Sequence, residues 1–210
     1  MKFEIRSAVL PLIVINIIVF ILQILLGRGF TDFFLLASED IFIRPWILLT
    51  HMFLHGGAMH LLYNMYGLFI FGSVLEERIG AKRFILFYLF AGIMAGFLSS
   101  FFYVRSLGAS GALMGVIGVL IILMPNLTLL FFYIVPTPLW LAGLIYAAID
   151  TIGIFFPSGV GNIAHLAGMG LGLLYGFYMK REKKVFTKKF SSKKHLEEAD
   201  IDEYLRSGRI

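Results

Sequence analysis

Long apolar runs separated by short polar breaks occupy most of this chain. The first run extends over residues 8–26, directly after Lys2 and Arg6. The later runs lie at about 60–75, 83–103, 110–124, 139–156 and 163–179. A helix needs about 20 mainly apolar residues to cross the hydrocarbon core of a bilayer, and most of these runs approach that length. The pattern predicts an all-α polytopic membrane protein with six transmembrane helices.

Two stretches between the runs differ from spanning helices. The segment 27–57 mixes charged residues with aromatic and aliphatic ones, which is typical of a loop lying in the membrane interface. The stretch 127–135 is apolar, but its nine residues, flanked by Pro125 and Pro136, are about half as long as a span. We expect this stretch to lie at the interface or to re-enter the membrane.

Lys and Arg residues are distributed unevenly around the predicted spans. Two precede the first span, three lie in the segment 76–83 and ten follow residue 179, whereas only Arg28, Arg44 and Arg105 lie on the other side. Because cytoplasmic loops of membrane proteins carry the excess of positive charge, both termini are predicted to be cytoplasmic, with the cell membrane as the location. A seventh span at 127–135 would place the basic tail outside, so we reject that topology.

The composition agrees with one membrane domain. Hydrophobic residues make up 59% of the 210 positions and charged residues 15%, and the mean hydropathy is +0.88. We expect a short segment 1–7, a helical domain 8–179, and a tail 180–210 that is first basic and then acidic. The net charge of +5 comes largely from that tail, which suits contact with anionic lipid or a regulatory contact, so nucleic acid is not an expected partner. The chain has no cysteine, which excludes disulfides and a catalytic thiol.

Three reactive side chains share one level in this topology. His60, Ser110 and His165 each fall in the first turn of a span that descends from the outer face, namely the second, fourth and sixth. Polar residues inside spans are costly, which makes each of them a functional candidate. We therefore expect a site near the outer face.

Ser110 lies between glycines in the sequence Gly108-Ala109-Ser110-Gly111. These glycines allow a tight turn into the fourth span and a close approach of substrate backbone. The unpaired amides of the first helical turn can stabilise the oxyanion that forms when a serine attacks a carbonyl. The fourth span has about 15 residues, or roughly 22 Å, so its first turn is expected below the membrane surface. Taken alone, Ser110 could equally be a simple N-cap.

His165 precedes a repeat of Gly168, Gly172 and Gly176 at every fourth position. Small residues at this spacing let membrane helices pack with their backbones nearly in contact. Such packing would bring the imidazole within hydrogen-bond reach of Ser110, where it can act as a general base. A purely structural hydrogen bond between helices is the alternative for an isolated histidine.

His60 and Asn64 are four residues apart and therefore share one face of a helix. Either side chain can donate a hydrogen bond to an oxyanion. His51 and His55 precede this pair, and we expect them to hold the outer loop in place by hydrogen bonds.

These motifs resemble, in order and spacing, the motifs of the rhomboid family of intramembrane serine proteases, over about residues 8–179. They are His51 and His55, His60–Asn64, Glu76–Gly80, Gly108–Gly111 and Ala164–Gly172. The chain departs from the family pattern at Met114, where many relatives carry an aromatic residue that stacks on the histidine, and at Arg44-Pro45-Trp46 in the outer loop.

The resemblance implies a catalytic dyad of Ser110 and His165 without an acidic third member. It implies oxyanion contacts from His60, Asn64 and the Ser110 amide, with Gly108, Gly111, Gly168 and Gly172 as structural support. It also implies a water-filled cavity that opens outward and is gated by the fifth span and the loop 157–162. Substrates would be transmembrane segments of other proteins in the bilayer, and neither a metal nor a cofactor is expected.

Asp150 is a lone charge in the fifth span and could orient His165 as the acid of a triad. It lies about eleven residues above the start of that span, which places it near the middle of the membrane. We therefore expect a helix-to-helix hydrogen bond from Asp150 and no role in catalysis. Glu76 and Arg78 lie at the cytoplasmic end of the second span, too far from Ser110 for chemistry, and are expected to bond loop backbone or each other.

Three other functions fit the sequence less well. A zinc protease built from His51, His55 and His60 lacks the glutamate of the His-Glu-x-x-His arrangement that activates water. A non-catalytic rhomboid relative would typically lack the serine or the histidine, and both are present. A transporter is expected to have paired charges or broken helices inside the membrane, whereas Asp150 stands alone.

Overall fold

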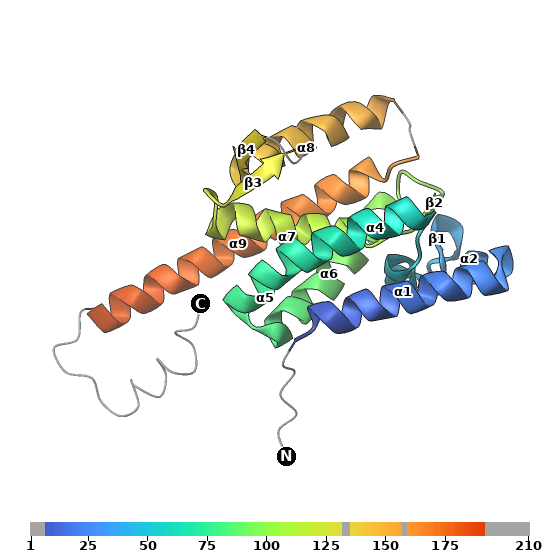
Figure 1. Cartoon of the computed structure of the whole chain (residues 1–210), viewed down its shortest axis with the longest axis horizontal. Coiled ribbons are helices and arrows are strands. Elements are labelled where there is room, and N and C mark those ends of the chain that lie inside the picture. Colours follow the sequence, from blue (N-terminus) through green and yellow to red (C-terminus); the bar gives the residue numbers. More distant parts are fainter. Residues whose placement is uncertain (1–6, 132–134, 157–158, 192–210) are drawn as a thin grey trace, which may run out of the picture.

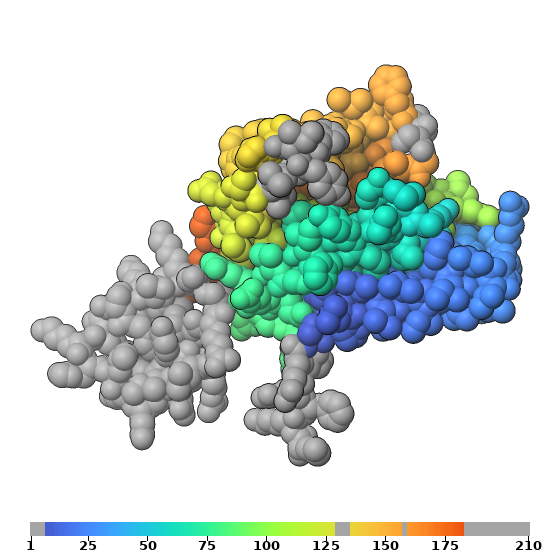
Figure 2. Space-filling view, in the orientation of Figure 1, coloured from blue at the N-terminus to red at the C-terminus, as the bar shows by residue number. Residues whose placement is uncertain are grey.

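Six apolar helical elements dominate the part of the chain that the structure describes. This structure is a computed structural model, and it describes residues 7–131, 135–156 and 159–191. The elements are α1 (Val9–Leu26), a continuous helix formed by α4 (Ala58–Gly67), η3 (Leu68–Gly72) and α5 (Ser73–Ile79), then α6 (Ala81–Ser99), α7 (Ser110–Leu123), α8 (Leu139–Phe155) and α9 (Asn162–Ser191). They run side by side in one bundle, with α1 along one edge and α8 along the opposite edge (Figures 1 and 2).

The lengths of these helices suit a membrane. Three of them, Val9–Leu26, Ala58–Ile79 and Ala81–Ser99, are long and apolar enough to cross a bilayer, and α7 and α8 are shorter apolar helices. Large apolar side chains such as Leu25 and Leu174 are exposed on the outside of the bundle, at 73% and 69% of their surface. Such a surface is unfavourable in water and stable against lipid tails.

The inner helix α7 packs against α9 with the two backbones in contact. A Cβ atom added at Gly168 would lie 2.0 Å from the carbonyl oxygen of Gly111, and one added at Gly172 would lie 2.0 Å from that of Gly115. Glycine at both positions is therefore a requirement of this packing and not only a permitted choice. The rest of α7 carries buried aliphatic side chains such as Val119, so this helix forms the centre of the core.

The outer segment between α1 and α4 is folded onto the bundle through short elements. It contains α2 (Arg28–Phe34), β1 (Leu36–Ala37), η1 (Ser38–Asp40), α3 (Ile47–Thr50) and η2 (His51–Phe53). Strand β1 pairs antiparallel with β2 (Arg105–Ser106), which lies just before the start of α7. The segment is thereby tied to the chain that leads into Ser110.

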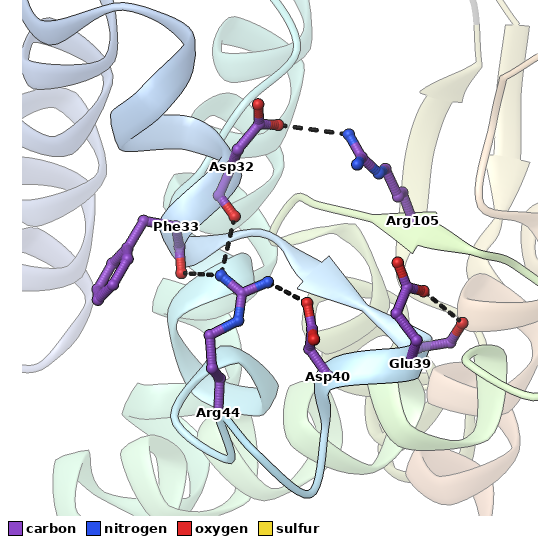
Figure 3. Close-up of polar contacts among 7 residues, drawn as sticks. Asp32, Phe33, Glu39, Asp40, Arg44 and Arg105 are labelled. Carbon is purple, nitrogen blue, oxygen red and sulfur yellow. Dashed lines mark hydrogen bonds and ion pairs between the residues drawn. The ribbon is translucent and has the colours of Figure 1, made fainter.

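A network of polar contacts closes the outer segment (Figure 3). The guanidinium of Arg44 donates to the carbonyl oxygens of Asp32 and Phe33, each at 3.2 Å, and forms an ion pair with Asp40. The carboxylate of Asp32 in turn lies 3.4 Å from Arg105. Arg44, which departs from the family pattern, is thus the residue that fastens α2 to the following turn.

His51 and His55 hold this segment by different means. The Nδ1–H of His51 donates to the carbonyl oxygen of Ile47 at 3.0 Å, and the carbonyl oxygen of His51 accepts the Gly108 N–H at 2.9 Å. The expectation for His55 was wrong for its ring: the ring nitrogens have no hydrogen-bond partner among the described residues. Its main chain is fastened instead, because Gln23 of α1 bonds both the His55 N–H, at 2.9 Å, and the carbonyl oxygen, at 3.3 Å.

Glu76 of α5 fastens the opposite end of the bundle. Its carboxylate accepts the Ser7 hydroxyl at 2.8 Å and also the backbone N–H of Ala8, at the start of α1. An anion at a helix N-terminus is favourable because it satisfies free N–H groups and faces the positive end of the helix dipole. The expected bond from Glu76 to loop backbone is therefore present.

Two predicted segments are defined further by the structure. In the apolar stretch at 127–135, β3 (Thr128–Phe131) pairs with the following β4 (Val135–Pro138) as an antiparallel hairpin, and its place at the interface or within the membrane stays a prediction. Prolines on either side favour extended backbone, which explains the hairpin. Helix α9 continues to Ser191, beyond residue 179 where the sixth span was predicted to end, because nothing in the basic sequence stops it; the end of the span itself stays a prediction. The acidic part of the tail and residues 1–6 lie outside the described residues.

Replacing Gly172 with alanine is predicted to destabilise the bundle. The added methyl group must push α9 away from the backbone of Gly115, and overpacking of this kind costs about 1–3 kcal/mol. Gly170 is the matched control, because a Cβ atom there meets nothing within 4 Å. Thermal unfolding in detergent micelles should show a lower Tm for Gly172→Ala and an unchanged Tm for Gly170→Ala. Equal Tm values for the two variants would contradict this packing of α7 on α9.

Acidification is predicted to weaken the outer segment. Burial lowers the pKa of His51 to about 4, and burial together with the neighbouring His60 lowers the pKa of His55 to about 4. Because both pKa values lie below the usual 6.5, the unfolded state binds more protons than the folded state between about pH 6.5 and pH 4. The free energy of unfolding therefore has its full value above about pH 6.5. It falls by about 2 kcal/mol for each histidine by pH 5.

The measurement is Tm in detergent between pH 7.5 and pH 5. Wild type should lose Tm over this interval, and the double variant His51→Asn/His55→Asn should lose less, although it starts lower. A wild-type Tm that stays constant down to pH 5 would show that neither buried ring is linked to folding.

Candidate active site

A cavity of about 870 Å³ opens between α4, α7 and α9 at the end of the bundle that carries the outer segment. His60, Asn64, Ser110 and His165 all line it. The segment 105–108 and residues 159–162 also contribute to its wall, whereas Pro157 and Ser158 lie outside the described residues. The structure therefore brings the four predicted polar side chains to one space.

Ser110 is the first residue of α7. Gly108 before it has φ +120°, a conformation that favours glycine, and a Cβ atom there would lie 2.8 Å from the His60 ring. The N-cap position belongs to Ala109, so the simple N-cap interpretation of Ser110 is wrong. The first bond of the helix runs from the Leu113 N–H to the Ala109 carbonyl oxygen, at 3.0 Å, so the amides of residues 110–112 precede the helical ladder and can donate elsewhere.

His165 lies in the first turn of α9 and contacts two other helices through its two ring nitrogens. Nε2 is 2.8 Å from Ser110 Oγ on α7, and Nδ1 is 3.0 Å from Asp150 Oδ1 on α8. A carboxylate only accepts, so Nδ1 carries the hydrogen and Nε2 presents its lone pair to the serine hydroxyl. This is the tautomer that a general base needs for taking the serine proton.

Asp150 forms the predicted helix-to-helix hydrogen bond, but its partner corrects the expected distance from Ser110 and His165. The sequence placed it near mid-membrane, away from these two residues, whereas in the structure its carboxylate bonds the His165 ring. The cause is the short α7: its 14 residues rise about 20 Å, and the eleven residues from Leu139 to Asp150 rise about 17 Å along α8. The end of α7 and the start of α8 lie at one level, because the Leu139 and Trp140 N–H groups bond the carbonyl oxygens of Leu127 and Pro125, which follow α7. Ser110 is thus about as deep as Asp150.

His60 and Asn64 each have an N–H group on the cavity wall that can donate a hydrogen bond. His60 Nδ1 accepts the Gly56 N–H at 3.3 Å, so in the neutral ring Nε2 carries the hydrogen, and it lies beside Gly108. The Asn64 side-chain amide donates one hydrogen to the His60 carbonyl oxygen at 2.9 Å. Its second N–H is left for another acceptor. Both groups can therefore donate into the space next to Ser110.

The histidines do not form a metal centre in the described residues. No group of three His, Cys, Asp or Glu side chains there has the geometry to hold an ion. The His51 ring bonds the Ile47 carbonyl oxygen and lies against α6, where a Cβ at Gly96 would meet it at 2.6 Å. The His55 ring packs edge to face on His60, with centroids 5.1 Å apart. Met114 is partly buried and packs against the core cluster, and the polar contact of the His165 Nδ1 atom is with Asp150.

Comparison with known proteins shows the family of this chain. A family model described as the rhomboid domain matches residues 44–182. The chain is 34% identical over 188 residues to "Rhomboid protein 1, mitochondrial" of Saccharomyces cerevisiae, covering 84% of this chain and 54% of that protein. It is 37% identical over 139 residues to "RHOMBOID-like protein 6, mitochondrial" of Arabidopsis thaliana, covering 65% of this chain and 44% of that protein. The chain thus spans about half the length of these two relatives.

A bacterial relative is covered over most of its length. "Rhomboid protease GlpG" of Haemophilus influenzae is 27% identical over 154 residues, which are 70% of this chain and 77% of that protein. The family model matches well over half of the chain. The chain therefore belongs to the rhomboid family of integral membrane proteins.

Proposed function

We propose that this chain is an intramembrane serine endopeptidase that hydrolyses peptide bonds in or near transmembrane segments of other proteins. The observation that carries the proposal is the 2.8 Å contact between Ser110 Oγ and His165 Nε2 at the wall of a cavity. A hydroxyl and an imidazole from separate helices meet there in the tautomer needed for nucleophilic attack. Relatives that are named rhomboid proteases support the same interpretation.

The reaction follows from the two nitrogens of His165. As Ser110 Oγ bonds to the carbonyl carbon of the substrate, its proton passes to Nε2, and the carbonyl oxygen takes the negative charge. The protonated Nε2 then gives this proton to the nitrogen of the leaving segment as the C–N bond breaks. Water hydrolyses the resulting ester of Ser110 by the same sequence, with His165 again as the base.

The negative oxygen of the intermediate is stabilised by donors from two helices. The amides at the start of α7 supply backbone N–H groups, and α4 supplies His60 Nε2 and the second N–H of Asn64. Preorganised donors of this kind stabilise the transition state more than the ground state. They explain why the serine begins a helix instead of lying within one.

The proposed arrangement in the membrane has six spanning helices, with both termini on the side that carries the excess of Lys and Arg. The cavity then opens on the opposite side. A substrate helix would enter from the lipid beside α8, with residues 159–162 at the wall of the site. Because relatives include proteins named mitochondrial and bacterial ones, the charge rule assigns the sides of the membrane and not the organelle.

Substitution of either member of the pair is predicted to abolish proteolysis. Ser110→Ala and His165→Ala should lower kcat for a transmembrane substrate by at least about 10³-fold, because the nucleophile or its base is lost. A fluorophosphonate probe should label wild type and neither variant. Ser38→Ala, which changes a partly exposed serine in η1, is the matched control and should be labelled like wild type. Equal labelling of wild type and Ser110→Ala would overturn the proposal.

Loss of an oxyanion donor is predicted to lower kcat and leave KM nearly unchanged. Asn64→Ala and His60→Ala should each cost about 10- to 100-fold in kcat, since the backbone amides remain. The exposed Asn126→Ala in the loop after α7 is the control and should behave like wild type. Steady-state kinetics in detergent would measure both constants. A rise in KM at constant kcat would mean that these side chains bind substrate and do not stabilise the intermediate.

A further inference from the structure

Asp150, a buried acid on α8, contacts His165, which in turn contacts Ser110. We propose that Asp150 is a positioning residue that orients His165 and stabilises the imidazolium formed during attack, which makes the site a Ser110–His165–Asp150 triad spread over three helices. This inference rests on the proposed function and deepens it. It concerns a residue outside the serine and histidine pair that the family resemblance implies.

The first support is geometric. His165 is held at both ends, with Nε2 at 2.8 Å from Ser110 Oγ and Nδ1 at 3.0 Å from Asp150 Oδ1. The side chains of His165 and Asp150 are only 14% and 6% exposed. The carboxylate therefore selects the tautomer with the lone pair on Nε2 and fixes the rotation of the ring toward the serine.

The second support is that the Asp150 carboxylate has no hydrogen-bond partner other than His165 among the described residues. Among the described residues, the carboxylate of Asp150 forms a single hydrogen bond, to His165, and its Oδ2 has no partner. An ionisable group inside an apolar helix is costly and is kept where it has a function. Here the positive partner arises in the reaction itself, when the serine proton reaches Nε2. The carboxylate keeps its charge throughout, and the hydrogen on Nδ1 stays where it is.

The third support is the place of Asp150 on α8. The neighbouring residues Ile149 and Ile152 are 54% and 60% exposed, so the outer half of this helix faces mostly outward. Asp150 is the buried member of this stretch, and Gly153 lies against Asn162 of α9, where an added Cβ would be 2.6 Å from the side-chain amide. The triad is thus complete only while α8 is seated on α9.

The test compares Asp150→Asn and Asp150→Leu with wild type, using the full chain in detergent and a transmembrane substrate. Both variants should lower kcat by about 10²- to 10⁴-fold with KM within about threefold, because removal of a triad acid misorients the base. Labelling of Ser110 by a fluorophosphonate should slow in parallel. Asp150→Leu should keep or raise Tm, since an apolar side chain replaces a buried charge. Glu77→Gln, an exposed acid in α5 at the opposite end of the bundle, is the control and should match wild type.

The outcomes separate this proposal from the one on which it rests. If wild type neither cleaves nor is labelled, the proposed protease function fails. If wild type is active, Ser110→Ala is inactive and both Asp150 variants keep wild-type kcat, only the triad fails. Turnover is counted per folded molecule, so a lower yield does not imitate the expected result. Collapse of the fold in both Asp150 variants would also overturn the proposal, because a positioning acid is not needed for folding.

Discussion

The contact between the backbones of α7 and α9 is the constraint on which the site depends. Side chains cannot fit at Gly168 and Gly172, where an added Cβ would meet a carbonyl oxygen of α7 at 2.0 Å. With nothing between the two helices, the first turn of α9 lies directly beside the first turn of α7. The short hydroxyl of Ser110 can then reach the imidazole of His165 at 2.8 Å without any backbone distortion at the serine. The glycines thus hold the two reacting groups close together, and holding them so carries the main entropic cost of forming a catalytic pair.

The second constraint is the depth of the site. A helix of 14 residues such as α7 cannot reach both faces of an ordinary bilayer, so its first turn begins inside the protein. Polar groups at that level need partners, and the cavity of about 870 Å³ gives substrate and solvent a place among them. The β1–β2 pairing and the bond from Gly108 to the His51 carbonyl oxygen hold the approach to the serine in position. The outer segment is therefore part of the support of the site.

Much of this arrangement could be predicted from the sequence because it depends on local spacing. Glycines at every fourth residue predict a close helix contact, and a serine between glycines at the start of an apolar run predicts free amides. The parts that could not be predicted depend on long-range geometry. The bonds of Gln23 to the main chain of His55 join positions 32 residues apart, and no local pattern marks them. The strands at 128–131 and 135–138 could not be predicted because a short apolar run suits a strand or a buried helix equally.

The predicted separation of Asp150 from Ser110 was wrong although the rise calculated along α8 was correct. Counting residues along α8 gave a correct rise of about 17 Å, but the expected short length of α7 was not applied to the depth of Ser110 and His165 relative to Asp150. The short α7 lowers the catalytic pair to the level of the acid, and the three side chains then meet on three helices. Two of these helices are held together by glycine contacts, and the third, α8, lies at the edge of the bundle (Figures 1 and 2). In the proposed protease the orientation of the base would thus depend on an edge helix, so a movement of α8 that admitted a substrate would also act on the chemistry of His165.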